Sequence, residues 1–340
     1  MKPAENINVF AIAPDGSHIQ RVTIANGGAR ASLITWGATL QDFRLDGVNH
    51  SFVLGSPVFE PYLGTMKYFG AIVGRAANRI SNAPTVLDSQ ALNFEFNEND
   101  QTILHGGRDG ASAQNWAIED QGPDYCQFSL RLPDGQGGFP GDLDVRSTYR
   151  LTSDGTLRLE IEAQTDQTTY CNFAHHTFWN LDGTDDLSSH GLTINADNFL
   201  PVDERLIPLG ALAPVAGTPV DFRNSKPVIA AGQPVIDYNF CINDGPGQLR
   251  QHCLLETEQF ALSVRSTEPG LQVYDAGRLS TAPDCGHGGK PYGKNAGLAL
   301  EPQRWPDAPH QPDYPSIELQ PGETYRQTSE FQLAARVRPS

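Results

Sequence analysis

The feature that most constrains the fold is a two-residue alternation of apolar and polar side chains, interrupted by turn sequences. Residues 157–163 (LRLEIEA) place Leu157, Leu159 and Ile161 on one face and charged side chains on the other, and residues 260–266 (FALSVRS) repeat the pattern. Such alternation is typical of antiparallel strands with one face in the core. Turn sequences, such as PDG at 133–135 and SDG at 153–155, separate these runs. The pattern predicts an all-β protein, a large antiparallel β-sandwich formed by residues 1–340 as a single domain.

Charge and cysteine content exclude several classes of protein. The 340 residues include 40 Asp and Glu against 24 Lys and Arg, a formal net charge of -16, which argues against nucleic-acid and anionic-membrane partners. The N-terminus lacks the apolar run of a signal peptide, and nothing approaches the roughly 18 apolar residues of a membrane-spanning helix. The five cysteines form no C-x-x-C pair. We therefore expect a reduced protein of the cytoplasm.

Common metal, phosphate and nucleophile motifs are absent. The sequence contains no H-E-x-x-H, no G-x-x-x-x-G-K-[ST] and no G-x-S-x-G. We therefore expect neither a metal nor a cofactor.

Two adjacent histidines, His175 and His176, lie in the apolar segment NFAHHTFWNL at 172–181. Neighbouring side chains of a strand point to opposite faces, and neighbours on a helix do not face each other either. The two imidazoles therefore do not share one ligand. One of them faces a site or, as the alternative, both are structural residues whose hydrogen bonds are satisfied.

Two more segments carry candidate side chains. His105 follows an apolar run and precedes two glycines in TILHGG, which indicates either an unobstructed imidazole or a strand-ending turn. Arg75 and Arg79 lie between apolar residues in YFGAIVGRAANRIS (68–81). A buried arginine needs a partner, and here the partner is either a ligand oxygen or a carboxylate of the protein.

A carboxylate ends the last apolar run, GLALEPQRWPDAPH at 297–310. Alternation places Leu298 and Leu300 on one face and Glu301 on the other, and we expect Pro302 to end regular pairing. Partial desolvation would raise the pKa of Glu301 and make it a better base. The alternative is a surface carboxylate paired with Arg304.

Taken in order, eight segments make the sequence resemble the aldose 1-epimerases, or galactose mutarotases. They cover nearly the whole chain: WGATLQDF, GRAANRI, LHGG, DGQGGFPGDL, HHTFWNLDG, DYNF, LQVYDAG and ALEPQRWPDAPHQPDYPS. The resemblance implies an antiparallel β-supersandwich and an isomerase that interconverts the α and β anomers of free monosaccharides without a cofactor.

The resemblance also implies roles for single residues. His176, in HTFWNL, matches the general acid and Glu301, in LEPQ, matches the base, while His175 stands where the family usually has asparagine. Arg75, His105 and Asp237 match residues that hold sugar hydroxyls or the ring oxygen, with Tyr238 in place of a usual histidine.

Ring opening requires that one group removes the C1 hydroxyl proton and another protonates the ring oxygen. A histidine titrates near 6.5, so we expect a carboxylate, with Asp237 as the candidate, to raise the pKa of His176. The sequence specifies neither the preferred aldose nor the oligomeric state.

Two alternatives share the same fold. The first is a non-catalytic sugar-binding or regulatory module. The second is an epimerase of a phosphorylated or acidic sugar, which requires extra cations near the site. Lys290 and Lys294, in GHGGKPYGKN, are the candidates for that role.

Overall fold

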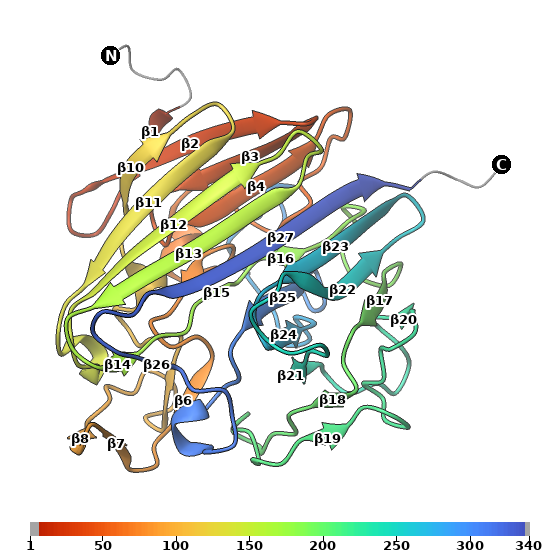
Figure 1. Ribbon diagram of the computed structural model, residues 1–340. Helices are drawn as coiled ribbons and strands as arrows, with labels where there is room; N and C mark the ends of the chain where they lie inside the picture. The colour runs from red at the N-terminus through yellow and green to blue at the C-terminus, as the bar shows by residue number, and fades with distance from the viewer. Residues whose placement is uncertain (1–6, 337–340) are drawn as a thin grey trace.

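The computed structural model describes residues 7–336, and its regular secondary structure consists almost entirely of antiparallel β-strands (Figure 1). The largest sheet has nine strands in the order β10 (Ala117–Gln121), β11 (Tyr125–Leu132), β12 (Leu143–Leu151), β13 (Leu157–Thr165), β27 (Tyr325–Ala335), β23 (Phe260–Ser266), β22 (Arg250–Glu256), β17 (Gly191–Ile194) and β20 (Lys226–Pro227). The predicted antiparallel β-sandwich is confirmed.

Two further sheets complete the layers. A four-stranded sheet has the order β1 (Ile7–Ile12), β2 (His18–Asn26), β3 (Ala29–Ile34) and β4 (Thr39–Leu45). A six-stranded sheet has the order β16 (Phe178–Trp179), β25 (Leu298–Gln303), β24 (Gly270–Tyr274), β21 (Asp237–Cys241), β18 (Asn198–Phe199) and β19 (Ala213–Pro214).

Short elements connect these sheets. Two-stranded pairs are β5 (Ile72–Val73) with β15 (Ala174–His175), β6 (Arg79–Ser81) with β9 (Thr102–Leu104), β7 (Thr85–Leu87) with β8 (Gln90–Leu92), and β14 (Thr169–Tyr170) with β26 (Glu318–Leu319). Single 3₁₀ turns are η1 (Glu60–Leu63), η2 (Ala111–Ala113), η3 (Gln136–Gly138) and η4 (Ala308–His310). Within residues 7–336 no helix has the length and apolar character required to cross a bilayer.

One hydrophobic cluster joins the three large sheets. It includes Phe43 of β4, Phe128 of β11, Phe331 of β27, Leu271 of β24 and Leu300 of β25, all fully buried. The long strands β11, β12, β13 and β27 run side by side across the molecule in Figure 1, with β21, β24 and β25 beneath them. Burial of this apolar surface is the main favourable contribution to folding.

The alternation read from the sequence is present in the strands. In β13 the apolar residues are buried, while the charged residues between them are at least partly exposed, and β23 shows the same pattern. Strand β25 differs because it is buried on both faces: Leu298 and Leu300 join the main cluster, and Ala299 joins a second one.

The expectation that Pro302 ends strand pairing is wrong. Strand β25 continues to Gln303, and Pro302 pairs with Leu271 of β24. Pairing with β16 ends at Ala299, so at Pro302 the strand has a partner on one side only. A proline is tolerated at such an edge because no neighbouring strand requires the backbone N–H that proline lacks.

Arg75 lies between β5 and β6 and has a structural role, because its side chain binds the connection between β11 and β12. Its side chain is 2% exposed and lies over the ring of Phe139. The guanidinium donates to four carbonyl oxygens and one hydroxyl, those of Leu132, Pro133, Pro140, Gly141 and Thr169. The two ends of the connection are thereby bound to the segment between β5 and β6.

Replacing Arg75 with methionine is expected to lower the free energy of unfolding by about 3 kcal/mol, because several buried carbonyl groups lose a charged donor. Urea unfolding measures the change. Arg146→Met is the control, since Arg146 makes a solvent-exposed ion pair with Glu119 and should change the midpoint little. An Arg75→Met protein of unchanged stability that fails to bind sugar would instead indicate a substrate-binding arginine.

Two histidines are buried in the layers as neutral imidazoles. His175, in β15, contacts the rings of Tyr149 and Phe331, and His252, in β22, is fully buried. Burial lowers the pKa of each to about 3. In the unfolded chain an imidazole titrates near 6.5, so below that pH the unfolded state binds protons that the folded state does not.

The free energy of unfolding is therefore expected to fall as the pH falls from 6.5 towards 3, with no contribution from these histidines above 6.5. Each contributes a slope of up to about 1.4 kcal/mol per pH unit. In His175→Asn the slope should be shallower by that amount, whereas His18→Asn, at an exposed position, should match the wild type. Denaturant titrations from pH 4.5 to 8 measure the slopes, and identical slopes in all three proteins would contradict this account.

Candidate active site

A cavity of about 350 Å³ opens beside the six-stranded sheet and brings four of the five predicted site residues together. They are Glu301, His176, His105 and Asp237. The volume lies at the lower end of the range for small-molecule sites. Residues from distant parts of the chain complete the lining, among them Lys67, Tyr68, Asn78, Arg79, Phe178, Gln272, Tyr274 and Arg278.

Three neighbouring strands position the acidic side of the cavity. Glu301 of β25 lies opposite Gln272 of β24, and Asp237 of β21 lies opposite Tyr274 of β24. The Gln272 side chain donates from Nε2 to Asp237 Oδ1 at 2.7 Å. Gln272 therefore bridges the strands that carry the two carboxyl groups and fixes the orientation of one of them.

The two adjacent histidines point in opposite directions. His175 lies against Tyr149 and Phe331 of the nine-stranded sheet and contacts the Thr177 hydroxyl at 2.9 Å. His176 lies between β15 and β16, where its ring contacts those of Tyr68, His105 and Phe178 in the cavity. The expectation that the two imidazoles do not share a ligand is confirmed, and His176 is the one that faces the site.

His105 directly follows strand β9 and is held by Asn78, the residue before the paired strand β6. The backbone N–H of Asn78 donates to His105 Nδ1 at 3.1 Å, and the His105 N–H donates to the Asn78 carbonyl at 2.9 Å. Both residues have left-handed backbone conformations, with φ values of 59° and 54°. Gly106 is required next to them, because a Cβ there would lie 2.1 Å from the Gly74 carbonyl oxygen.

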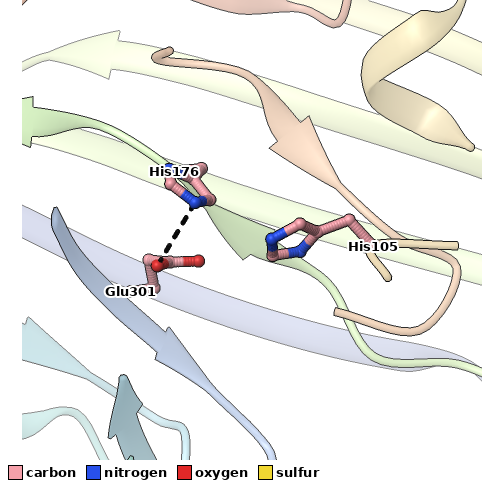
Figure 2. A group of neighbouring side chains, drawn as sticks. All are labelled: His105, His176 and Glu301. Carbon is pink, nitrogen blue, oxygen red and sulfur yellow. Dashed lines mark ion pairs between the residues drawn. The ribbon is translucent and has the colours of Figure 1, made fainter. Parts of the chain in front are cut away.

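Glu301 and His176 form the polar centre of the cavity (Figure 2). His176 Nε2 lies 3.6 Å from Glu301 Oε1, and the two side chains are 10% and 2% exposed. Within the described part of the chain, Glu301 Oε2 and His176 Nδ1 have no hydrogen-bond partner. Buried polar atoms are rarely left unpaired, so the carboxyl group is available to a ligand.

Burial moves the pKa values of this pair in opposite directions. It raises the pKa of Glu301 well above its usual range, with a further increase from the charge of Asp237. It lowers the pKa of His176 to about 4. The expectation that a carboxylate raises the pKa of His176 is therefore wrong for the free protein, because desolvation of the imidazolium outweighs the attraction of the carboxylate. Burial thus favours the neutral carboxyl group and the neutral imidazole in the free protein.

His105, His176 and Glu301 have side-chain atoms within 4.8 Å of one another, a spacing that a metal ion could bridge. The hydrogen bond from Asn78 N–H, however, makes His105 Nδ1 an acceptor. Burial lowers the pKa of His105 well below its usual value, so the ring is neutral and its proton lies on Nε2. An Nε2–H group donates hydrogen bonds and lacks the lone pair that a metal requires. The three side chains are therefore better suited to hydrogen bonds with the oxygen atoms of an organic ligand than to metal binding.

The two arginines of GRAANRI have different positions. Arg75 does not line the cavity, and its donors are used by the carbonyl groups described above. Arg79 does line it, at the start of β6, and makes a bidentate ion pair with Glu98 at 2.7 Å. The expected substrate contact of Arg75 is not supported by its position, and of these two arginines it is Arg79 that lines the cavity.

Several lining residues were not singled out from the sequence. Gln272 lies within LQVYDAG, and its position opposite Glu301 becomes apparent only when β24 pairs with β25. Among the aromatic residues of the HHTFWNLDG and ALEPQRWPDAPHQPDYPS segments, Phe178 lines the cavity. Trp179 instead stacks on Phe331 in the core, and Trp305 packs on Tyr314.

Comparison with known proteins supports one family. The family model described as aldose 1-epimerase matches residues 20–332. The galactose mutarotase of Rattus norvegicus is 36% identical over 342 residues, covering 96% of this chain and 97% of the relative. The aldose 1-epimerase of Escherichia coli (strain K12) is 36% identical over 343 residues, covering 96% and 98%.

Solved structures agree with these matches. An aldose epimerase homologue from C. elegans has a TM-score of 0.86 at 29% identity, covering 93% of this chain and 99% of that one. The galactose 1-epimerase of Lactobacillus acidophilus has a TM-score of 0.83 at 25% identity, covering 97% and 98%. With a family match over most of its length and relatives of 36% identity along nearly all of it, the chain belongs to the aldose 1-epimerase family and is an isomerase.

Proposed function

We propose that this protein interconverts the α and β anomers of free aldoses, with Glu301 and His176 as the proton-transferring pair. The observation that carries the proposal is the 3.6 Å approach of His176 Nε2 to Glu301 Oε1 inside a cavity large enough for a monosaccharide. A pure sugar-binding module has no need to desolvate such a pair.

In the proposed reaction a Glu301 carboxylate removes the proton of the C1 hydroxyl while His176 gives a proton to the ring oxygen. The bond between C1 and the ring oxygen breaks, the resulting aldehyde rotates about C1–C2, and the reverse transfers close the ring on the other face. The sequence of steps conserves the single proton of the pair. A sugar hydroxyl that donates to the unpartnered Glu301 Oε2 favours the carboxylate, and the shared proton then lies on His176.

The remaining groups are proposed to hold the sugar. His105 donates from Nε2 to a sugar oxygen, since its Nδ1 accepts from Asn78. Asp237, fixed by Gln272, accepts from sugar hydroxyls, and Arg79 donates to one. Arg79 replaces Arg75 in this role. The face of Phe178 contacts C–H groups of the ring.

Three broader expectations remain proposals. We propose that residues 1–340 form one domain, which is supported by the hydrophobic cluster that joins the three sheets. A cytoplasmic location is supported by the cysteines Cys126, Cys171, Cys241, Cys253 and Cys285, none of which is in a disulfide. The ligand is proposed to be a monosaccharide.

Glu301→Gln and His176→Gln are each expected to lower kcat/KM for aldose mutarotation by 10²–10⁴-fold, the usual contribution of a general acid or base. Polarimetry of freshly dissolved α-glucose and α-galactose measures the rates. Glu268→Gln is the matched control, because Glu268 is equally buried, has a raised pKa of about 7, and does not line the cavity. Equal losses in Glu268→Gln would indicate a general structural effect, and unimpaired Glu301→Gln would exclude the proposed base.

The pH dependence of kcat/KM follows from the opposed pKa shifts. The pair is active while one of its two members carries the proton, so activity should fall on the acid side as His176 is protonated near pH 4 and on the alkaline side above the usual range of a carboxyl group. We therefore expect the acid limb of the profile to lie well below the pKa of an ordinary histidine. A decrease centred near pH 6.5, the titration of an ordinary histidine, would contradict the desolvated pair.

A further inference from the structure

Two cationic side chains lie at the mouth of the cavity and have no part in the proposed proton transfer. Lys67 follows η1, and Arg278 follows β24, so segments more than 200 residues apart supply them. Both are exposed, and both line the cavity that contains Glu301 and His176.

Neither side chain has a direct ion-pair partner among the described residues, although Lys67 interacts electrostatically with Glu98 and Arg278 with Asp237. Among residues 7–336, neither side chain makes a hydrogen bond or an ion pair, and the Lys67 ammonium lies only over the ring of Tyr68, at 4.6 Å. A lysine or arginine beside a ligand cavity, with its donors unused, can bind an anionic group of the ligand.

The nearby carboxylates are engaged elsewhere. Glu98 binds Arg79, Asp237 accepts from Gln272, and Asp284 accepts from the Thr65 hydroxyl at 2.7 Å. Arg278 nevertheless acts on the interior of the cavity, because burial raises the pKa of Asp237 and the charges of Arg79 and Arg278 offset part of this increase. Burial is also the main cause of the lowered pKa of His105, to which His176, Arg79 and Lys67 add. Two cationic side chains thus stand at the mouth of the cavity in a chain whose net charge is -16.

The lysines considered from the sequence do not have this position. Lys290 and Lys294 line a different groove, which they share with Asp185 and Asp186. The linings of both sites contain three cationic and two acidic residues. In the active cavity, however, one of the two acidic residues, Glu301, is favoured by burial in its neutral form.

We propose that Lys67 and Arg278 recognise an anionic substituent of the aldose, so that the protein acts on sugars carrying a carboxylate or a phosphate ester in addition to the reacting anomeric centre. The inference rests on the proposed epimerase function and narrows its substrate class. Anomeric interconversion leaves the substituent unchanged, so the same proton transfers between Glu301, His176 and the ring suffice and no co-reactant is needed.

The test compares kcat/KM for glucose, galactose, glucuronate, galacturonate and glucose 6-phosphate by polarimetry. Wild type is compared with Lys67→Gln, Arg278→Gln and the double variant, and Lys290→Gln/Lys294→Gln is the control in the other groove. Each rate for an anionic sugar is divided by the rate for its neutral counterpart. A larger ratio for the uronates identifies the carboxylate as the preferred group, and a larger ratio for glucose 6-phosphate identifies the phosphate.

In wild type at low salt we expect this ratio to exceed one. It should fall by about tenfold in the double variant, in line with two partly solvated charge contacts, and by less in each single variant. Added salt should lower the ratio in wild type and have little effect on it in the double variant, because screening weakens exposed charge pairs. The Lys290→Gln/Lys294→Gln protein should keep the wild-type ratio.

Two failures are distinguishable. Turnover of glucose and galactose with a ratio below one, or with a ratio that the double variant leaves unchanged, would overturn the anionic substrate class and leave the epimerase function intact. No acceleration with any of the five sugars by folded wild-type protein would overturn the epimerase function and the inference together.

Discussion

The desolvation of Glu301 against His176 is the constraint on which the site depends. Strand β25 is buried on both faces, so its one carboxylate enters a cavity whose walls are protein. Burial disfavours the charged forms of both side chains, whose nearest nitrogen and oxygen atoms are 3.6 Å apart. An acid and a base at a single centre, able to exchange roles as a ring opens and closes, follow from this one feature.

Strands of the scaffold carry the acidic groups of the site, Glu301 on β25 and Asp237 on β21. Strands β21, β24 and β25 are hydrogen-bonded neighbours, and Gln272 links their acidic side chains across the sheet. Opposite them, the short pair of β6 and β9 supplies Arg79 and holds His105 through a bend closed by Asn78. Groups on regular elements keep positions that loops alone do not maintain. The exposed cations at the mouth, in contrast, come from connecting segments, where charge can change without disturbing the core.

The two arginines show where sequence reasoning stops. Arg75 and Arg79 lie four residues apart between apolar residues, and only the start of β6 at Arg79 belongs to a regular strand. Outside a regular strand there is no two-residue alternation of side chains, so the sequence does not show which way either arginine side chain points. The partners that distinguish them are distant in sequence: carbonyl groups near residues 132–141 for Arg75, and Glu98 together with the cavity for Arg79. The pKa of His176 was misjudged for a related reason, because desolvation depends on the packing of layers that a sequence does not display.

The sequence by itself determined the β-sandwich, through alternation that only half-buried strands satisfy, and the opposite orientation of His175 and His176, through the period of two. Ordered motifs indicated the family. The tertiary structure decided which of the two arginines lines the cavity, in which directions burial moves the pKa values of Glu301 and His176, and which cations stand at the mouth. These properties are set by distances and burial among residues that are in some cases more than 200 positions apart, and such distances exist only once the sheets have packed.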